Sequence, residues 1–186
     1  MVLTALAISV TLGIIIGYLI TYNKTAAKFV IYVCGMLMTI PSLALFVFFI
    51  PFLGIGPTPA IAGLVIYTLL PNVRNVYVGL TNIDPVIIMA ARGMGMREWV
   101  ITLKIRVPLA LPVAFAGIRT AVVMGIGLGA IAAYIGAGGL GVLIFQGINR
   151  GITEMILVGA ILISLITIVV DKLMQLIQKQ AEKMVR

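Results

Sequence analysis

Five long apolar stretches follow one another along the chain, separated by short polar or glycine-rich segments. The stretches cover residues 2–20, 29–50, 60–80, 109–134 and 152–176. A bilayer core about 30 Å thick is crossed by about 20 apolar residues of helix. The pattern therefore predicts an all-α membrane protein with five transmembrane helices, in which residues 1–186 form a single transmembrane domain.

The composition argues against a soluble domain, a metal site and an enzyme. Hydrophobic residues make up 62% of the chain and charged residues 10%, whereas soluble domains carry about 25% charged residues. A soluble domain therefore does not fit beside five spans. The chain has one cysteine and no histidine, which disfavours a transition-metal site and removes the usual general base of enzymes. We predict no catalytic residue and no metal site.

The basic residues predict the orientation in the membrane. With five spans, one side carries eleven of them and the other side carries only Arg150. Positive charge marks the cytoplasmic side, so we expect the N-terminus outside, the C-terminus inside, and a cytoplasmic tail over residues 172–186. The net charge of +8 is then explained by the membrane rather than by nucleic acid. The eleven are Lys24, Lys28, Arg74, Arg92, Arg97, Lys104, Arg106, Lys172, Lys179, Lys183 and Arg186.

Three segments between the spans differ in character. Residues 21–28 are predicted to form a short polar loop, and residues 51–59, rich in proline and glycine, a tight external turn. Residues 135–151 contain six glycines around an apolar centre. We expect an external re-entrant or interfacial element there.

The remaining segment, residues 84–108, is too charged to span a bilayer and is expected in the cytoplasm. Asp84 suits an N-cap and Pro85 the first helical position. The chain has no nucleotide-binding loop and no acidic residue or histidine at the centre of a span, so uphill transport would need energy from another polypeptide. This segment is the candidate docking site for that partner. The expected elements are a helix from Pro85 to about Arg92, a break at Gly93 and Gly95, and an amphipathic helix from about Met96 to Arg106.

Polar residues near two proline sites are candidates for a transport pathway. Thr39, Pro41 and Ser42 interrupt the second stretch, either as a flexible path lining or as a kink patched by hydroxyls. Asn72 and Arg74 lie near the end of the third stretch. They either line the inner mouth of a pathway or anchor the helix at the interface, where an arginine can extend to the lipid headgroups.

Arg119 is the one charge inside the fourth stretch, roughly 16 Å of helix beyond Pro108. An intramembrane arginine is costly and is a candidate functional residue. The alternative is a structural arginine that holds backbone carbonyls of a neighbouring helix. No acidic partner is expected at that depth, since Asp171 is placed near the end of the last stretch.

The segment over residues 84–108 resembles the cytoplasmic signature of ABC importer permeases, E-A-A, three residues, G, nine residues, I-x-L-P. Met89-Ala90-Ala91, Gly95 and Ile105-Arg106-Val107-Pro108 match its register, with Met89 in place of Glu and Val107 in place of Leu. Most of the chain is similar to the permeases of glycine betaine, carnitine and choline importers. The matching stretches are TIPSLAL (39–45), FLGIG (52–56), LLPNVRNVYVGL (69–80), AARGMG (90–95), LALPVAFAGIRTA (109–121) and IGAGGLG (135–141).

The resemblance implies a type I ABC importer fold and its partners: a second permease subunit, identical or related, two cytoplasmic ATPases that bind ATP and Mg²⁺, and an external substrate-binding protein. Ala90, Ala91 and Gly95 would pack in the ATPase cleft, and Arg92 and Arg97 would meet its rim. Amino acids such as methionine remain an alternative cargo, and an ion-coupled carrier or channel an alternative class. The coupling residues that the resemblance implies are Asp84, Pro85, Met89, Ala90, Ala91, Arg92, Gly93, Gly95 and Arg97.

Aromatic rings could contact a quaternary ammonium through cation–π attraction. Rings within spans mostly pack against other residues or face lipid, so a cage in this subunit is not expected. The rings in or near the spans include Phe46, Phe48, Phe49, Tyr67 and Tyr134.

Overall fold

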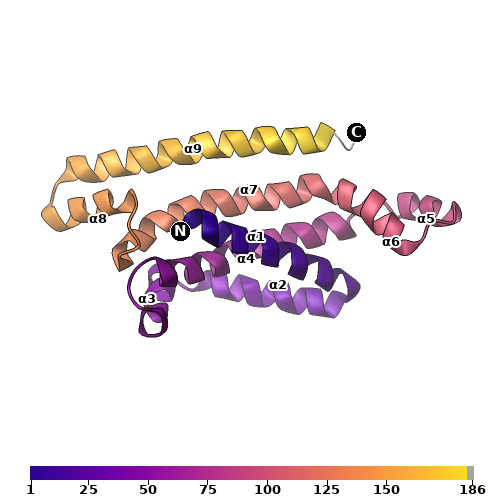
Figure 1. The fold of residues 1–186 in the computed structure, drawn as a ribbon, viewed down its shortest axis with the longest axis horizontal. Coiled ribbons are helices and arrows are strands. Elements are labelled where there is room, and N and C mark those ends of the chain that lie inside the picture. The colour runs from indigo at the N-terminus through magenta and orange to yellow at the C-terminus, as the bar shows by residue number, and fades with distance from the viewer. Residues whose placement is uncertain (184–186) are drawn as a thin grey trace.

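The computed structural model describes residues 1–183, without the side chains of residues 181 and 182, and this part is built from helices and the turns between them. No strand occurs in these residues, so the expected all-α class is confirmed. Four long helices lie along the molecule (Figure 1). They are α1 (Val2–Leu19), α4 (Pro57–Thr81), α7 (Val107–Ile131) and α9 (Thr153–Lys183).

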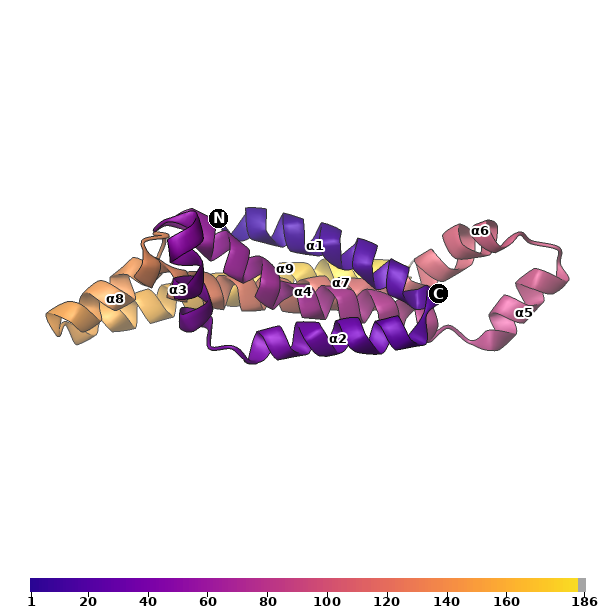
Figure 2. The same cartoon turned by 90° about the horizontal axis from the view of Figure 1, so that it is seen from below.

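Five shorter helices occupy the rest of the described chain. They are α2 (Lys24–Thr39), α3 (Ser42–Leu53), α5 (Pro85–Gly93), α6 (Glu98–Ile101) and α8 (Gly141–Arg150). Figures 1 and 2 show α5 and α6 projecting from one end of the bundle, with α3 and α8 at the other. We call these the α5–α6 end and the α3–α8 end.

Positive charge gathers at the α5–α6 end. Ten of the eleven basic residues that the sequence assigns to one side lie near this end (Figure 1). They belong to α5, to the turns beside α5 and α6, and to the nearest halves of α2, α4 and α9. The eleventh, Arg186, lies outside the described residues. Arg150 ends α8 at the opposite end. The fold therefore groups the basic residues as the sequence pattern predicts.

The number of spans depends on how the second stretch is counted. Within the described residues, four helical segments are long and apolar enough to cross a membrane: Val2–Tyr22, Pro57–Thr81, Glu98–Ile135 and Thr153–Gln180. The second stretch is instead divided into α2 and α3, whose axes differ by 94°. The five-span prediction holds only if this bent pair is counted as one span.

Pro41 explains the division between α2 and α3. It has no backbone N–H to continue the helix, and Ile40 before it is extended, with φ −65° and ψ 131°. The hydroxyl of Tyr67 on α4 donates a hydrogen bond to the Ile40 carbonyl. A backbone acceptor released by the break therefore finds a partner on a neighbouring helix, as an apolar environment requires.

Glycines allow the central helices to approach one another. A Cβ at Gly17 of α1 would lie 2.9 Å from the Val73 carbonyl oxygen of α4. On the other side of α4, a Cβ at Gly117 of α7 would lie 2.7 Å from the Pro71 carbonyl oxygen. Small residues at such crossings let backbones pack closely in a membrane. The helix α4 is therefore the centre of the bundle, between α1 and α7.

Two expected loops are shorter than the sequence suggests. A 3₁₀ turn (Ile20–Tyr22) and an N-cap at Asn23 replace the expected loop over residues 21–28. The Asn23 side chain accepts two N–H groups of the first turn of α2, at 2.9 and 3.3 Å. In the expected turn over residues 51–59, Pro51 belongs to α3, and the change of direction falls at residues 54–56.

The last two expected segments also contain more helix. Residues 135–151, expected as a glycine-rich element, contain α8, which packs on α9. The expected tail over residues 172–186 is not separate, because α9 continues without interruption to Lys183.

Candidate functional site

The helix α5 begins as its sequence predicts. Asp84 precedes the first turn, and its side chain accepts a hydrogen bond from the Val86 N–H at 2.8 Å. Pro85 occupies the first helical position, where its missing N–H costs nothing. Both residues therefore fix where the projecting segment leaves α4.

The turn after α5 depends on Gly95 rather than on Gly93. Gly93 is still helical, whereas Gly95 has φ +77°. The Met96 N–H donates to the Ala91 carbonyl at 3.2 Å, and the Gly95 N–H to the Arg92 carbonyl at 2.9 Å. These bonds define a Schellman motif, in which glycine supplies the left-handed residue.

An internal ion pair closes this turn. The Arg92 Nε donates to Glu98 Oε1 at 2.6 Å, and both side chains are more than half exposed. The hydrogen bond and the charge of Glu98 raise the pKa of Arg92 above its usual value. Arg92 therefore has an acidic partner within its own chain, and its contact with the rim of the ATPase cleft stays a prediction. Glu98 had no local sequence signal, since six residues is not a helical contact spacing.

Burial divides the expected coupling residues into two groups. Ala91 is fully buried within the chain, so its side chain is covered by this chain, and its contact with an ATPase stays a prediction. Ala90, Gly93 and Arg97 are exposed. The outward surface is also apolar, because Val86, Ile87, Met89 and Met94 have exposed side chains.

The segment continues into α7 without the expected boundary at Pro108. A π-helical turn, Thr102–Arg106, connects α6 to α7, and the Val107 N–H donates to the Thr102 carbonyl. Pro108 then lies in the first turn of α7, and Pro112 inside it. A wider turn relieves the clash that a proline ring makes with the carbonyl four residues earlier. The predicted amphipathic helix is thus short and is joined directly to a span.

The polar residues at the break between α2 and α3 serve local structure. The Thr39 hydroxyl donates to the Met36 carbonyl at 2.7 Å. Together with the Tyr67 bond to Ile40, this matches the kink patched by hydroxyls. Pro41 is exposed and Ser42 half-buried.

Asn72 packs between two helices rather than on an open surface of the chain. It is buried where α1 crosses α4, and its Nδ2 donates to Ser9 Oγ at 3.0 Å and to the Thr68 carbonyl at 2.9 Å. The contacts of Asn72 are therefore between helices of this chain, and the two roles considered for it stay predictions. Arg74 is exposed on another face of α4.

Arg119 forms an ion pair with Asp171 of α9. Its Nε donates to Asp171 Oδ1 at 2.6 Å, and a terminal nitrogen donates to Oδ2 at 2.8 Å. Each side chain is 29% exposed. A two-pronged pair of this kind fixes geometry as well as charge. The expectation that no acid reaches this depth, with the arginine holding backbone carbonyls instead, is wrong.

This acidic partner was not predicted from the sequence because the last helix is longer than the last apolar stretch. Arg119 lies twelve positions after the start of α7 at Val107, and Asp171 twelve before the described end of α9 at Lys183. The two helices are antiparallel (Figure 1), so equal offsets place the side chains at one depth. A cavity of about 390 Å³, lined by both charged residues and by Thr120, opens beside the pair between α7 and α9.

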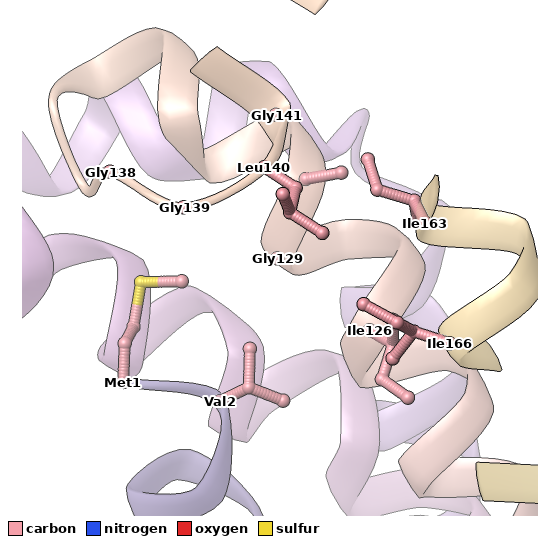
Figure 3. Close-up of a pocket in the computed structure, with 11 residues that line it drawn as sticks. Met1, Val2, Ile126, Gly129, Gly138, Gly139, Leu140, Gly141, Ile163 and Ile166 are labelled. Carbon is pink, nitrogen blue, oxygen red and sulfur yellow. The ribbon is translucent and has the colours of Figure 1, made fainter. Parts of the chain in front are cut away.

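A second cavity lies at the α3–α8 end and is lined by apolar side chains and glycines. Its volume is about 170 Å³. Figure 3 shows Met1 and Val2 on one side and Ile126 and Ile166 on the other, with Leu140 and the glycines beside it completing the wall. No lining side chain is charged.

Three of the aromatic rings considered from the sequence make contacts within the chain. Phe46 is fully buried, and its ring packs against Gly63. Tyr67 is buried against the break, and Tyr134 contacts Phe145. These rings serve packing.

Comparison with known proteins decides the family. The family model described as the binding-protein-dependent transport system inner membrane component matches residues 9–184. The chain belongs to this family. The family comprises the membrane subunits of ABC importers, so this chain is a permease subunit, and ATP hydrolysis is carried out by a partner ATPase.

Curated relatives cover most of this permease. It is 43% identical over 183 residues to the osmoprotectant import permease protein OsmW of Salmonella typhimurium, spanning 96% of this chain and 85% of the relative. It is 42% identical over 169 residues to the carnitine transport permease protein OpuCB of Listeria monocytogenes, spanning 91% and 78%.

A solved structure shows the same fold. The inward-facing MetNI methionine ABC transporter matches with a TM-score of 0.79 at 24% identity, over 97% of this chain and 94% of that one. The expected type I ABC permease fold is therefore confirmed.

Proposed function

We propose that this permease imports quaternary-amine osmoprotectants such as carnitine, choline and glycine betaine. The observation that carries the proposal is the set of relatives at 36–43% identity, whose names specify carnitine, choline, glycine betaine or osmoprotectant transport. A further relative, of Helicobacter pylori, is named for ergothioneine transport and binding, at 40% identity over 90% of this chain. Carnitine, choline, glycine betaine and ergothioneine all carry a trimethylammonium group.

The alternative cargo, methionine, has less support. The methionine transporter is similar at 24% identity, which carries the fold and no statement about cargo. An ion-coupled carrier would need an ionisable group able to change its charge within the spans. The one acidic side chain found at such depth, among the described residues, is Asp171, and Arg119 already neutralises it.

The proposed docking site for the ATPase is α5 and the turn at Gly95. Three properties support it: the segment projects from the bundle (Figure 2), its exposed surface includes apolar side chains, and the Arg92–Glu98 pair links α5 to α6. Because α6 continues into α7, movement of α5 would reach a span directly. Met89 stands where the family signature has Glu, and it is 60% exposed, so position 89 would offer an apolar contact.

The proposed assembly has the α5–α6 end in the cytoplasm, the N-terminus outside and the C-terminus inside, in agreement with the grouping of basic residues. A second permease subunit, identical or related, would complete the pathway, and an external binding protein would deliver the cargo. ATP binding by the paired ATPases would draw the two α5 segments together, and hydrolysis would release them. Thr39, Ser42, Arg74 and Arg119 remain the residues to test for contact with the pathway.

The docking proposal is tested by Ala90→Arg in proteoliposomes that contain the ATPase and the binding protein. Ala90 is exposed on α5, so arginine can be placed there without disturbing the bundle. We expect loss of ATPase co-purification and of ATP-driven uptake. The matched control is Thr25→Arg, which adds the same side chain to an exposed site on α2 at the same end. Equal coupling in both variants would exclude α5 as the docking helix.

The cargo is tested in the unmodified system by competition. Labelled choline or carnitine uptake should be reduced by unlabelled quaternary amines and not by methionine. Competition by methionine alone would reject the proposed substrate class while leaving the docking result intact.

A further inference from the structure

A third cavity lies at the α5–α6 end, where the end of α1 meets α4 and the projecting segment. Its volume is about 310 Å³, near the lower limit of small-molecule sites. Three aromatic residues and two charged residues line it: Tyr18, Tyr22, Trp99, Glu98 and Arg106. This combination is absent from the apolar cavity of Figure 3.

The two tyrosines form perpendicular walls. Their ring centroids are 5.5 Å apart with planes at 90°, and their hydroxyls share a hydrogen bond of 2.5 Å. Trp99, the only tryptophan of the chain, lines the same cavity from α6. Aromatic faces set at an angle to one another offer a cation several electron-rich surfaces at once.

The two charged residues give the cavity a negative and a positive pole. Glu98 contributes a carboxylate, which Arg92 orients from outside the cavity through its 2.6 Å bond. Arg106 forms a long ion pair with Glu98, 3.9 Å between Nη2 and Oε2, without a hydrogen bond. Its guanidinium can therefore direct a two-pronged contact to an anionic group of a ligand.

We propose that this cavity binds a zwitterion in which a quaternary ammonium lies close to an anionic group. The ammonium would lie among the aromatic rings beside Glu98, and the anionic group would contact Arg106. A free betaine and the phosphocholine headgroup of a lipid share this chemistry. Residues of α1, α4 and α6 line the cavity. A bound ligand would therefore contact the projecting segment and two spans together.

An ordinary interfacial belt explains only part of this arrangement. Tyrosine and tryptophan gather at membrane interfaces without any ligand. A belt does not require an acidic and a basic side chain in the same cavity as the rings. Because the cavity lies at the end of the bundle, binding there can also be measured whatever cargo the importer carries.

The test uses the full chain in nanodiscs of phosphatidylethanolamine and phosphatidylglycerol, and again with phosphatidylcholine. Trp99 fluorescence is titrated with choline, with glycine betaine, and with 3,3-dimethylbutan-1-ol, which has the shape of choline without its charge. Tyr22→Leu removes one wall; Tyr22 is 73% exposed, so the core is untouched. Phe48→Leu, at an exposed ring on α3, is the matched control.

A free ligand gives a saturable response to choline and glycine betaine in the first nanodiscs, weakened about 3- to 30-fold by Tyr22→Leu and unchanged by Phe48→Leu. Arg106→Gln should then weaken glycine betaine more than choline, because choline has no anionic group. If the ligand is a lipid, Trp99 fluorescence should differ between the two nanodisc types, and Tyr22→Leu should abolish this difference. In nanodiscs that contain phosphatidylcholine, choline and glycine betaine should then leave the fluorescence unchanged. An equal response to the uncharged alcohol, or no effect of Tyr22→Leu on either signal, overturns the proposal.

Discussion

Replacing Gly117 with alanine tests the close crossing of α4 and α7. A Cβ at position 117 would lie 2.6 Å from the Asn75 Cβ and 2.7 Å from the Pro71 carbonyl oxygen. Ordinary contact begins at 3.4 Å. The helices must therefore separate by about 0.7 Å, and one obstacle is backbone, which has no rotamer to change.

The expected cost follows from overpacking. Inserting a methyl group into a packed site costs about 1–3 kcal/mol. Alanine also favours helix over glycine by about 1 kcal/mol, and this gain partly offsets the cost. Gly127→Ala, in the same helix with no atom within 4 Å of the added Cβ, has the same gain and no clash. The two variants should therefore differ by about 1–3 kcal/mol in the free energy of unfolding.

The assay is unfolding by sodium dodecyl sulfate in mixed micelles, followed by far-ultraviolet circular dichroism. Gly117→Ala should unfold at lower detergent fraction than Gly127→Ala, and the unmodified chain should be about 1 kcal/mol less stable than Gly127→Ala. If the two alanine variants unfold together, α4 and α7 do not cross as closely as described. The difference is measured between variants of one helix, so a general effect of alanine on α7 cancels.

Three further outcomes are expected. Tyr67→Phe should destabilise the chain by about 1–3 kcal/mol in the same titration, because a carbonyl at the break between α2 and α3 loses its partner; no change would assign the bend to proline alone. Arg119→Asp and Asp171→Arg should each lower the yield of folded protein by size-exclusion chromatography, and the double swap should recover it; failure of the swap to improve on either single variant would contradict a mutual pair. Gly95→Ala should make the coupling segment more sensitive to trypsin, since a left-handed backbone costs alanine about 1–2 kcal/mol, whereas Gly93→Ala, helical and in open space, should not; equal sensitivity would contradict the Schellman turn.

The segment over residues 84–108 shows how far local sequence reasoning reached. Asp84, Pro85 and Gly95 were assigned correctly because caps and left-handed turns act within a few residues. The inward position of Ala91 and the pairing of Arg92 with Glu98 were missed. Both depend on how α5 folds back on α6, which no local pattern describes.

Long-range contacts within the bundle were the second feature that sequence reasoning could not predict. Asn72 and Ser9 are 63 positions apart, and Arg119 and Asp171 are 52 apart. Hydropathy assigns each residue to a span but does not specify its rotation about the helix axis or the end of that helix. The sequence alone is therefore equally compatible with a pathway role and with a structural role for a polar residue in a span.

The sequence by itself determined the membrane class, the apolar stretches, the grouping of charge and the capped segment between the third and fourth spans. These follow from the thickness of a bilayer and from short-range backbone chemistry, both of which act along the chain. Only the tertiary structure decided the 94° bend, the neutral Arg119–Asp171 pair and the aromatic cavity at the α5–α6 end. Each of these joins side chains from different helices, and their meeting depends on helix rotation and close packing, which a pattern of hydrophobic positions does not contain.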